Sequence, residues 1–406
     1  MKKKLLPALI VTGLIILVVI IMGITALINK YTPTKKTEDL KEYFNISSDD
    51  EAALIVDNEL SDYKAKIIDK KIYVDYKFVH DSLNSRFYWD ANENVLLYTT
   101  ASDIISAAAD SNSYSVTKQT NDFGYPIVKA TSDSALIALD YVKQYSNITF
   151  KSYDDPARIV ITSKWDEIDS ATVSKSTQVR VKGGIKSPIL KEVKKDDKIT
   201  ILDSGDKWDK VATEDGIIGY IKRKALSESK KTKLTNPDYE EETFTHIKKD
   251  KDICLAWNQV TSQSANSKVP QVISSTKGIN VMSPTWFYLN DNNGNLADIA
   301  SKDYVNYCHS QGIEVWGLFS NLENTDVDAA YVLTHTSTRT TLINQIMSAA
   351  FNYELDGVNI DFENITEAAY GDSYIEFIRE LAIKCHNNGI SLSVDVTVPA
   401  SFNKFF

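Results

Sequence analysis

The stretch that decides the fold of the C-terminal region reads Leu355-Asp356-Gly357-Val358-Asn359-Ile360-Asp361-Phe362-Glu363. Its length suits one β-strand, in which successive side chains point to opposite faces of a sheet. One face is then an apolar row made of Val358, Ile360 and Phe362. The other face carries an amide and two carboxylates, from Asn359, Asp361 and Glu363. A general acid that works near neutral pH needs a raised pKa, and a neighbouring carboxylate provides this for Glu363. The alternative interpretation is a solvated edge strand with ordinary surface acids.

The nonapeptide resembles the active-site strand of glycoside hydrolase family 18, the chitinase-like family, whose signature is D-x-x-D-x-D-x-E. Asp356, Asp361 and Glu363 match that signature. Asn359 stands where most chitinases have aspartate, whereas the cell-wall and spore-cortex N-acetylglucosaminidase branch often reads D-G-x-N-x-D-F-E. The asparagine at position 359 therefore changes the expected substrate more than it threatens catalytic activity.

The resemblance implies substrate-assisted, retaining hydrolysis of an N-acetylhexosamine glycoside, an exception to the scheme with two catalytic carboxylates. Glu363 would protonate the glycosidic oxygen and later activate water. Asp361 would accept a hydrogen bond from the 2-acetamido N–H, so that the acetamido carbonyl oxygen attacks the anomeric carbon. Asn359 would support Asp361 from below. Asp356 falls on the other parity, before the strand proper, and we expect it to hold the start of the strand.

Tryptophans near strand ends are the candidates for stacking on sugar rings. Trp286, which Phe287 and Tyr288 follow near the end of a predicted strand, is preferred over Trp257 and Trp316. We therefore predict that Trp286 and Tyr288 bind substrate, with core packing as the alternative for Trp286. In the family, a Tyr-Asp pair from the sixth strand and a Trp from the eighth complete the sugar site, and we expect both beyond the last residue of this chain.

Alternating strand and helix signals surround the nonapeptide and predict a parallel sheet. Apolar strand candidates lie at residues 252–257, 279–287, 313–319, 357–362 and 390–396. The spacing suits a TIM-type (β/α)₈ barrel, whose active site lies at the C-terminal ends of the strands. A complete barrel takes about 250 residues. We therefore expect residues 245–406 to form an incomplete barrel of about five strands, with little or no activity in the truncated chain itself.

The N-terminus is apolar. Three lysines precede an uncharged run from Leu5 to Ile28, which is long enough for a bilayer crossing of about 20 residues. We predict an uncleaved signal anchor, a transmembrane helix at residues 1–30, with the lysines in the cytoplasm. The rest of the chain would then be extracellular and face the cell wall, beginning with a stalk at residues 31–44. A cleaved signal peptide is the alternative.

Residues 45–166 predict an α+β domain built from a repeat. Each copy has a strand, a short helix and a β-hairpin, and the copies begin near Ile72 and Leu136. This repeat resembles the copper-amine-oxidase N-terminal-like domain of exported bacterial proteins. The stretch contains one histidine, His80, and no copper-ligand cluster. We interpret the domain as a spacer or a wall-contact module.

Residues 169–228 predict a small all-β barrel with short alternating strands. The run V-R-V…D-K-W-D-K-V…G-I-I-G-Y-I resembles a bacterial SH3 domain, and such domains commonly bind cell-wall peptides. Trp208 and Tyr220 are candidates for lining a peptide groove, with core packing as the alternative. Residues 229–244 predict a linker to the barrel region.

Composition excludes some classes of function. A net charge of −10 argues against nucleic-acid binding. Three scattered cysteines and five scattered histidines show no metal-ligand spacing, so we predict buried free thiols, no metal and no cofactor. One disulfide with one free thiol is the alternative.

The function predicted from these features is a membrane-anchored extracellular glycoside hydrolase. It would cleave β-1,4 linkages of N-acetylglucosamine, with peptidoglycan as the expected partner and substrate and chitin as the alternative. The competing hypotheses are a catalytically inactive glycan-binding protein on the same fold and a purely adhesive scaffold.

Overall fold

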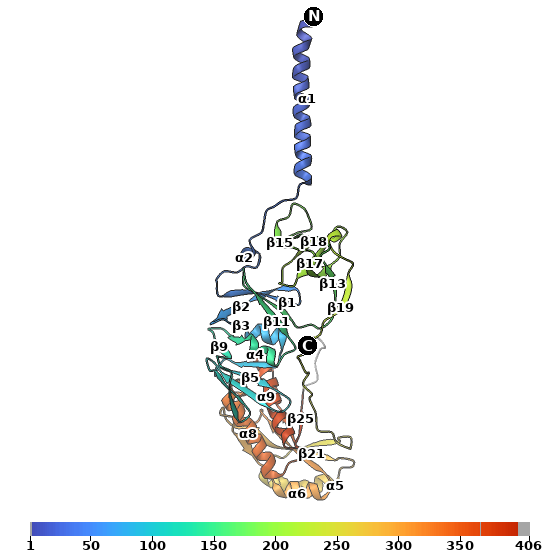
Figure 1. The fold of residues 1–406 in the computed structure, drawn as a ribbon. Coiled ribbons are helices and arrows are strands. Elements are labelled where there is room, and N and C mark those ends of the chain that lie inside the picture. Colours follow the sequence, from blue (N-terminus) through green and yellow to red (C-terminus); the bar gives the residue numbers. More distant parts are fainter. Residues whose placement is uncertain (1, 366, 397–406) are drawn as a thin grey trace. The chain divides into compact units, whose positions relative to one another are not determined.

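The computed structural model describes residues 2–365 and 367–396. The chain divides into two compact units, Met1–Tyr73 with Lys143–Tyr239, and Val74–Val142 with Glu240–Phe406 (Figure 1). The predicted repeat domain, residues 45–166, contributes chain to both units, and the predicted domain boundaries stay predictions. The last ten residues of the predicted barrel region, 397–406, lie outside the described residues.

The first unit begins with one long apolar helix, α1 (Lys2–Tyr31). Its segment Leu9–Tyr31 is long and apolar enough to cross a membrane, and no part of that segment is buried in the protein. A helix that is apolar all round and exposed along Leu9–Tyr31 is suited to apolar surroundings. The chain therefore has an N-terminal helix of the kind found in membrane spans and signal sequences, and its topology stays a prediction.

The segment predicted as a stalk is packed rather than free. Thr37 bridges to Ile189, and the short helix α2 (Leu40–Tyr43) follows. Phe44 is fully buried and belongs to a core that also contains Ile55 and Val211. Burial of an aromatic ring ties this segment to the sheets of the first unit.

The all-β pattern predicted for residues 169–228 is present as a seven-stranded antiparallel sheet in the order β15-β14-β18-β17-β16-β13-β19. Its strands are β13 (Glu167–Thr172), β14 (Thr177–Arg180), β15 (Ile189–Val193), β16 (Lys198–Asp203), β17 (Trp208–Thr213), β18 (Ile218–Lys222) and β19 (Lys230–Lys233). Trp208 and Tyr220, the predicted groove residues, are half-buried. Trp208 lines a groove of about 520 Å³ together with Lys207, Lys222 and Lys224.

The predicted repeat is visible in the order of elements along the chain. The first copy is β3 (Lys71–Asp75), α3 (Tyr76–Phe78), β4 (Phe87–Asp90) and β5 (Val95–Thr99). The second copy is β10 (Ala135–Ala138), α4 (Leu139–Gln144), β11 (Thr149–Tyr153) and β12 (Arg158–Thr162). Strand β12 also pairs in parallel with β1 (Glu51–Val56), which pairs with β2 (Glu59–Ile68), while β10 pairs with β9 (Val128–Ala130).

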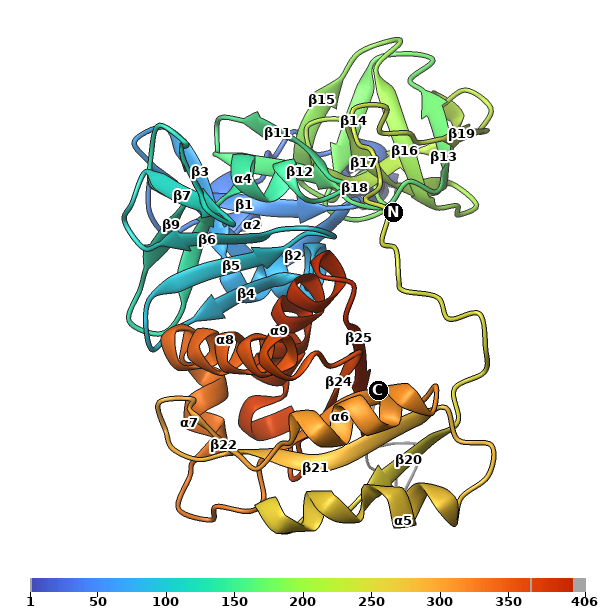
Figure 2. The ribbon, with the colours of Figure 1, turned by 90° about the horizontal axis from the view of Figure 1, so that it is seen from below.

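The second unit contains the five parallel strands that the sequence predicts, in the order β20-β21-β23-β24-β25 (Figure 2). They are β20 (Leu255–Asn258), β21 (Val281–Leu289), β23 (Glu314–Ser320), β24 (Gly357–Asp361) and β25 (Ser391–Val394), with β22 (Leu296–Asp298) antiparallel to β21. The helices between them are α5 (Val269–Ser274), α6 (Lys302–Ser310), α7 (Ala329–Thr334), α8 (Thr336–Tyr353) and α9 (Glu367–Asn387).

The two faces of β24 differ as predicted. Val358 and Ile360 are fully buried in a core to which α8 contributes Ile346 and α9 contributes Phe377. The polar parity faces the other side of the sheet. The first residue of the strand, Gly357, is a glycine because a Cβ there would lie 2.6 Å from the indole of Trp316 on β23.

An antiparallel sheet in the same unit follows the order β4-β5-β6-β7-β8, with β6 (Ile104–Ala108), β7 (Ser113–Val116) and β8 (Gln119–Asp122). Its β4–β5 hairpin supplies hydrogen-bond acceptors to the first turn of α8. Asp90 Oδ2 accepts from Thr336 N at 2.7 Å, and Glu93 Oε2 accepts from Ser337 N at 2.9 Å. The first N–H groups of a helix have no partner within the helix, so these carboxylates cap α8 from outside.

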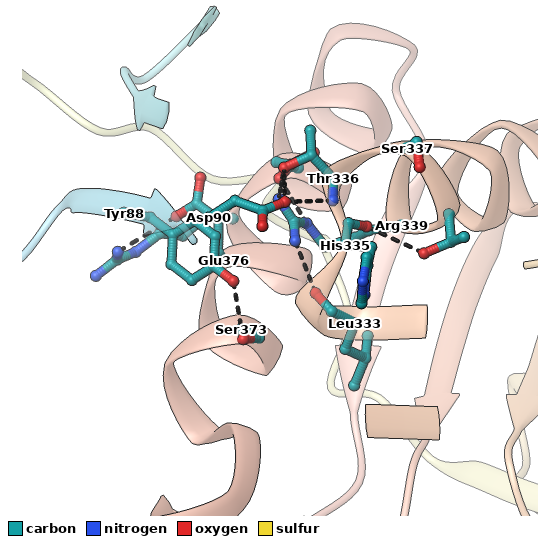
Figure 3. A network of polar contacts seen from close by, with 12 residues as sticks. Tyr88, Asp90, Leu333, His335, Thr336, Ser337, Arg339, Ser373 and Glu376 are labelled. Carbon is teal, nitrogen blue, oxygen red and sulfur yellow. Dashed lines mark hydrogen bonds and ion pairs between the residues drawn. The ribbon is translucent and has the colours of Figure 1, made fainter. Parts of the chain in front are cut away.

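A buried polar network lies beside this cap (Figure 3). Arg339 of α8 donates to Glu380 Oε1 at 2.9 Å and to Leu333 O at 2.7 Å. Tyr88 of β4 contacts Ser373 of α9 through their hydroxyl oxygens, 2.9 Å apart. The network joins the hairpin to both helices that flank β24 in sequence.

Candidate functional site

The candidate site lies on the polar face of the parallel sheet. Residues paired across parallel strands point to the same face, and Tyr288, Ser320 and Asp361 are paired in turn across β21, β23 and β24. Asn359 pairs with Leu318 on one side and Ser393 on the other, one inward position below. Asp361 therefore stands at the carboxyl end of the sheet, with Asn359 beneath it.

A hollow of about 450 Å³ opens at this end of the sheet. It is lined by Trp257, Thr285, Leu318, Asp361, Val394, Asp395 and Val396. Trp257, at 62% exposure, presents an apolar ring face close to a carboxylate. An exposed indole can cover the apolar face of a sugar ring while a carboxylate takes its polar groups.

Asp361 is one of two carboxylates that line the hollow, and its environment disfavours the charged form. Burial raises the pKa of the Asp361 carboxyl, and the charges of Asp395, Glu363 and Glu323 raise it further. Within the described part of the chain, no hydrogen bond reaches the Asp361 carboxylate. Its oxygens are therefore available to a ligand.

Glu363 follows β24, and its side chain is exposed. Asn321, just after β23, holds the backbone of Glu363 at two points. Glu363 N donates to Asn321 Oδ1 at 2.9 Å, and Asn321 Nδ2 donates to Glu363 O at 3.1 Å. This pair of bonds fixes the main chain, while the Glu363 side chain is exposed. Sequence reasoning missed Asn321, although an amide directly after the neighbouring predicted strand was a usable signal.

The hydrogen bonds of Asn359 do not go to Asp361, which it was expected to support. The Asn359 side chain is bonded to residues of the β25 segment: its Nδ2 donates to Asp395 Oδ2 at 2.7 Å, and its Oδ1 accepts from the Ser393 hydroxyl. No hydrogen bond joins it to Asp361 among the described residues. The reason is that the neighbouring strand offers a carboxylate and a hydroxyl at the same level.

Asp356 lies before β24 and is bonded to the neighbouring strand. Its Oδ2 accepts from Val315 N at 2.8 Å and lies 2.8 Å from His309 Nε2. These contacts support a structural role at the start of the strand.

The structure contradicts the prediction that Trp286 contacts substrate. Trp286 is 0% exposed, its Nε1 donates to Asn266 Oδ1 at 2.8 Å, and its ring packs on Tyr304. The pairing of β21 with β23 is irregular between Thr285 and Phe287, so Trp286 faces the helices while Tyr288 returns to the polar face. Tyr288 is half-buried beside the site, and Trp257 is the exposed tryptophan in the hollow.

The cysteines are free thiols, as predicted, but only two are buried. Cys308 and Cys385 are buried, and Cys254 is exposed. Across residues 2–365 and 367–396, no group of three or more His, Cys, Asp and Glu side chains is arranged to hold a metal ion.

Comparisons with known proteins were made at three levels. No family model matches the chain, and no curated protein matches it. Among solved structures, the chain is similar to a class V chitinase of Pseudomonas fluorescens Pf-5, with 15% identity over 38% of this chain and 47% of that chain and a TM-score of 0.33. It is similar to the spore cortex-lytic enzyme SleL of Bacillus megaterium QM B1551, with 18% identity over 37% and 35% and a TM-score of 0.32. It is also similar to a chitinase of Chromobacterium violaceum ATCC 12472, with 18% identity over 36% and 45% and a TM-score of 0.30. The chain spans less than half the length of each of these structures.

Proposed function

We propose that this chain carries the catalytic strand of a glycoside hydrolase of the family 18 type, which cleaves β-1,4 linkages of N-acetylglucosamine in peptidoglycan. One observation carries the proposal. In the described part of the chain the Asp361 carboxylate accepts no hydrogen bond, and it stands in a hollow with an exposed tryptophan, two residues before the exposed side chain of Glu363. The match of Asp356, Asp361 and Glu363 to the family signature adds to it.

In the proposed first step, the Glu363 carboxyl gives its proton to the glycosidic oxygen, and the bond from that oxygen to the anomeric carbon breaks. The acetamido carbonyl oxygen bonds to the anomeric carbon and forms an oxazolinium ion. Asp361 accepts a hydrogen bond from the acetamido N–H and stabilises the positive charge that develops on the oxazolinium ring. In the second step, the Glu363 carboxylate takes a proton from water. The water oxygen bonds to the anomeric carbon, and the bond from that carbon to the acetamido oxygen breaks, so that the acetamido group is restored and the configuration is retained.

Two features favour peptidoglycan over chitin as the substrate. The apolar helix α1 suits an anchor that would hold the enzyme at the cell surface. The seven-stranded sheet of residues 167–233 carries the SH3-like sequence pattern, and its groove combines Trp208 with basic side chains. A wall-binding module beside a glycosidase would keep the enzyme on its insoluble substrate by raising its local concentration.

Because little or no activity is expected from an incomplete barrel, the test is digestion of isolated peptidoglycan, in detergent, by the chain extended to a complete barrel, beside its Glu363→Gln variant. Glu354→Gln is the matched control, because Glu354 is an exposed glutamate that follows α8 at the opposite end of β24. We expect fragments with reducing-end N-acetylglucosamine from the parent and the control. The Glu363→Gln variant should release about 10²- to 10⁴-fold less, the usual contribution of a general acid. Wall binding without cleavage by any of the three proteins would instead establish a non-catalytic glycan-binding protein.

A further inference from the structure

A second aspartate shares the hollow with Asp361. Asp395 directly follows β25, and its backbone N–H donates to Ile360 O at 2.8 Å, so it extends the pairing with β24 by one residue. Its side chain therefore faces the same way as Ser393 and Asn359, toward the polar side of the sheet. It lines the hollow together with Asp361.

Asp395 and Ser393 form hydrogen bonds with the two polar atoms of the Asn359 amide. Asn359 is 1% exposed, and a buried amide of this kind needs partners for both its N–H₂ group and its oxygen. Asp395 Oδ2 accepts from Asn359 Nδ2 at 2.7 Å, and the Ser393 hydroxyl donates to Asn359 Oδ1. The amide is turned toward β25 and away from its own strand.

We propose that Asp395 is a positioning residue of the site, which holds the Asn359 amide away from Asp361 and so leaves the Asp361 carboxylate free for the acetamido N–H of the substrate. The inference rests on the proposed function. Without Asp395, the buried N–H₂ group of Asn359 loses its acceptor, and leaving it unpaired is costly. Asp361 is the carboxylate two residues along the same face of the strand. The amide would then turn to it and occupy the oxygens that the substrate needs.

The charges around Asp361 give this inference a second readout. Among the described residues, the ionisable groups that act on Asp361 or are acted on by it are Glu363 after β24, Glu323 after β23, Asp395 after β25 and Tyr374 on α9. Trp257 and Thr285 contribute uncharged groups from β20 and β21. Asp395 is the carboxylate that raises the pKa of Asp361 most, after burial. Removal of its charge should lower the pKa of Asp361.

The activity test compares four variants of the chain extended to a complete barrel, as in the test of the proposed function. Asp395→Asn keeps an acceptor for the Asn359 amide but removes the charge, so the acid limb of kcat/KM should move to lower pH. Asp395→Ala removes the acceptor, and kcat should fall about tenfold, the size expected for one hydrogen bond to a charged group. Asn359→Leu combined with Asp395→Ala removes the amide that would block Asp361, and kcat should recover. Ser393→Ala is the control, because it removes the other partner of Asn359 without a change of charge.

Two results would overturn the inference: an acid limb that stays in place in Asp395→Asn, or a double variant that is no more active than Asp395→Ala.

A measurement that does not depend on enzymatic activity separates this inference from the proposed function. Side-chain carboxyl NMR of ¹³C-aspartate-labelled protein, with Asp361→Asn for assignment, gives the pKa of Asp361 directly. The Asn359 side-chain amide signal should move in Asp395→Ala and should then follow the titration of Asp361, which it does not follow in the parent. If no protein cleaves glycan but these shifts appear, the proposed function fails while the role of Asp395 on Asn359 stands. If the shifts are absent, the role of Asp395 is refuted whatever the activity.

Discussion

Glu376 of α9 offers the sharpest test of the energetics, because it is a buried acid without adequate partners. Its side chain is fully buried, its Oε1 has no hydrogen bond within residues 2–365 and 367–396, and its Oε2 lies 3.5 Å from Arg379 Nη1. The pKa of Glu376 is raised to about 7, first by burial and then by the charge of Glu380, against the opposing effects of Arg379 and Arg339. Glu376 lies in the polar network next to Tyr88 and Arg339 (Figure 3).

The sign of the pH effect follows from that pKa. The folded protein holds a proton on Glu376 that the unfolded chain releases above its ordinary pKa of 4.5. Stability from this group is therefore complete below pH 4.5 and is lost as pH rises through about 7. A rise of the pKa from 4.5 to about 7 corresponds to about 3 kcal/mol, at about 1.4 kcal/mol for each unit.

We therefore expect Glu376→Gln, which keeps the shape and removes the charge, to stabilise the second unit by up to about 3 kcal/mol at about pH 8 and much less at about pH 4. The assay is urea unfolding of a soluble version of the chain that begins at Thr32, followed by hydrogen exchange of α9 peptides to locate the effect. Glu240→Gln, at an exposed glutamate of the same unit, is the control. An equal effect at both pH values, or destabilisation at the higher one, would refute the reasoning from a buried charge.

Four further outcomes are expected. Trp257→Ala should raise KM for a soluble glycan about 3- to 10-fold with a smaller effect on kcat, whereas Trp286→Phe should lower stability and leave KM unchanged, as Michaelis kinetics and urea unfolding would show. Asn321→Ala should lower kcat more than it raises KM, because the clamp on the main chain of the proposed acid is lost; single-turnover kinetics test this. Asp90→Ala should cost about 1 kcal/mol in urea unfolding through loss of the cap on α8. Trp208→Ala should weaken binding to isolated cell walls in a pelleting assay and leave cleavage of a soluble glycan unchanged.

The parallel sheet could be predicted because its signals are local. Strands covered on one or both faces are apolar runs, and glycine or asparagine marks the ends of the helices between them. The two faces of β24 followed from a period of two, and Val358 and Ile360 are indeed buried. The long apolar helix at the N-terminus followed from length and composition in the same way.

The errors and omissions at the site arise where the answer depends on another strand. Trp286 was assigned to the site from its place near a strand end, but an irregular pairing with β23 turns it toward the helices. Asp395 is 36 residues from Asn359, and Asn321 is 42 residues from Glu363, so only the strand order brings each pair together. Nothing in the sequence near Asn359 indicates that its amide turns to β25.

The cap on α8 has a consequence for how the chain folds during synthesis. Asp90 and Thr336 are 246 positions apart, and contacts between such distant residues form late because a long loop must close first. All residues of the first unit precede Glu240 and leave the ribosome before α8 exists. The first unit can therefore complete its core before α8 is synthesised. During that time the carboxylates of the β4–β5 hairpin are exposed to water. The segment from Val74 to Val142 is thus synthesised early but forms its contacts with α8 late. A version of the parallel sheet expressed without this segment would have to fold with the first turn of α8 uncapped.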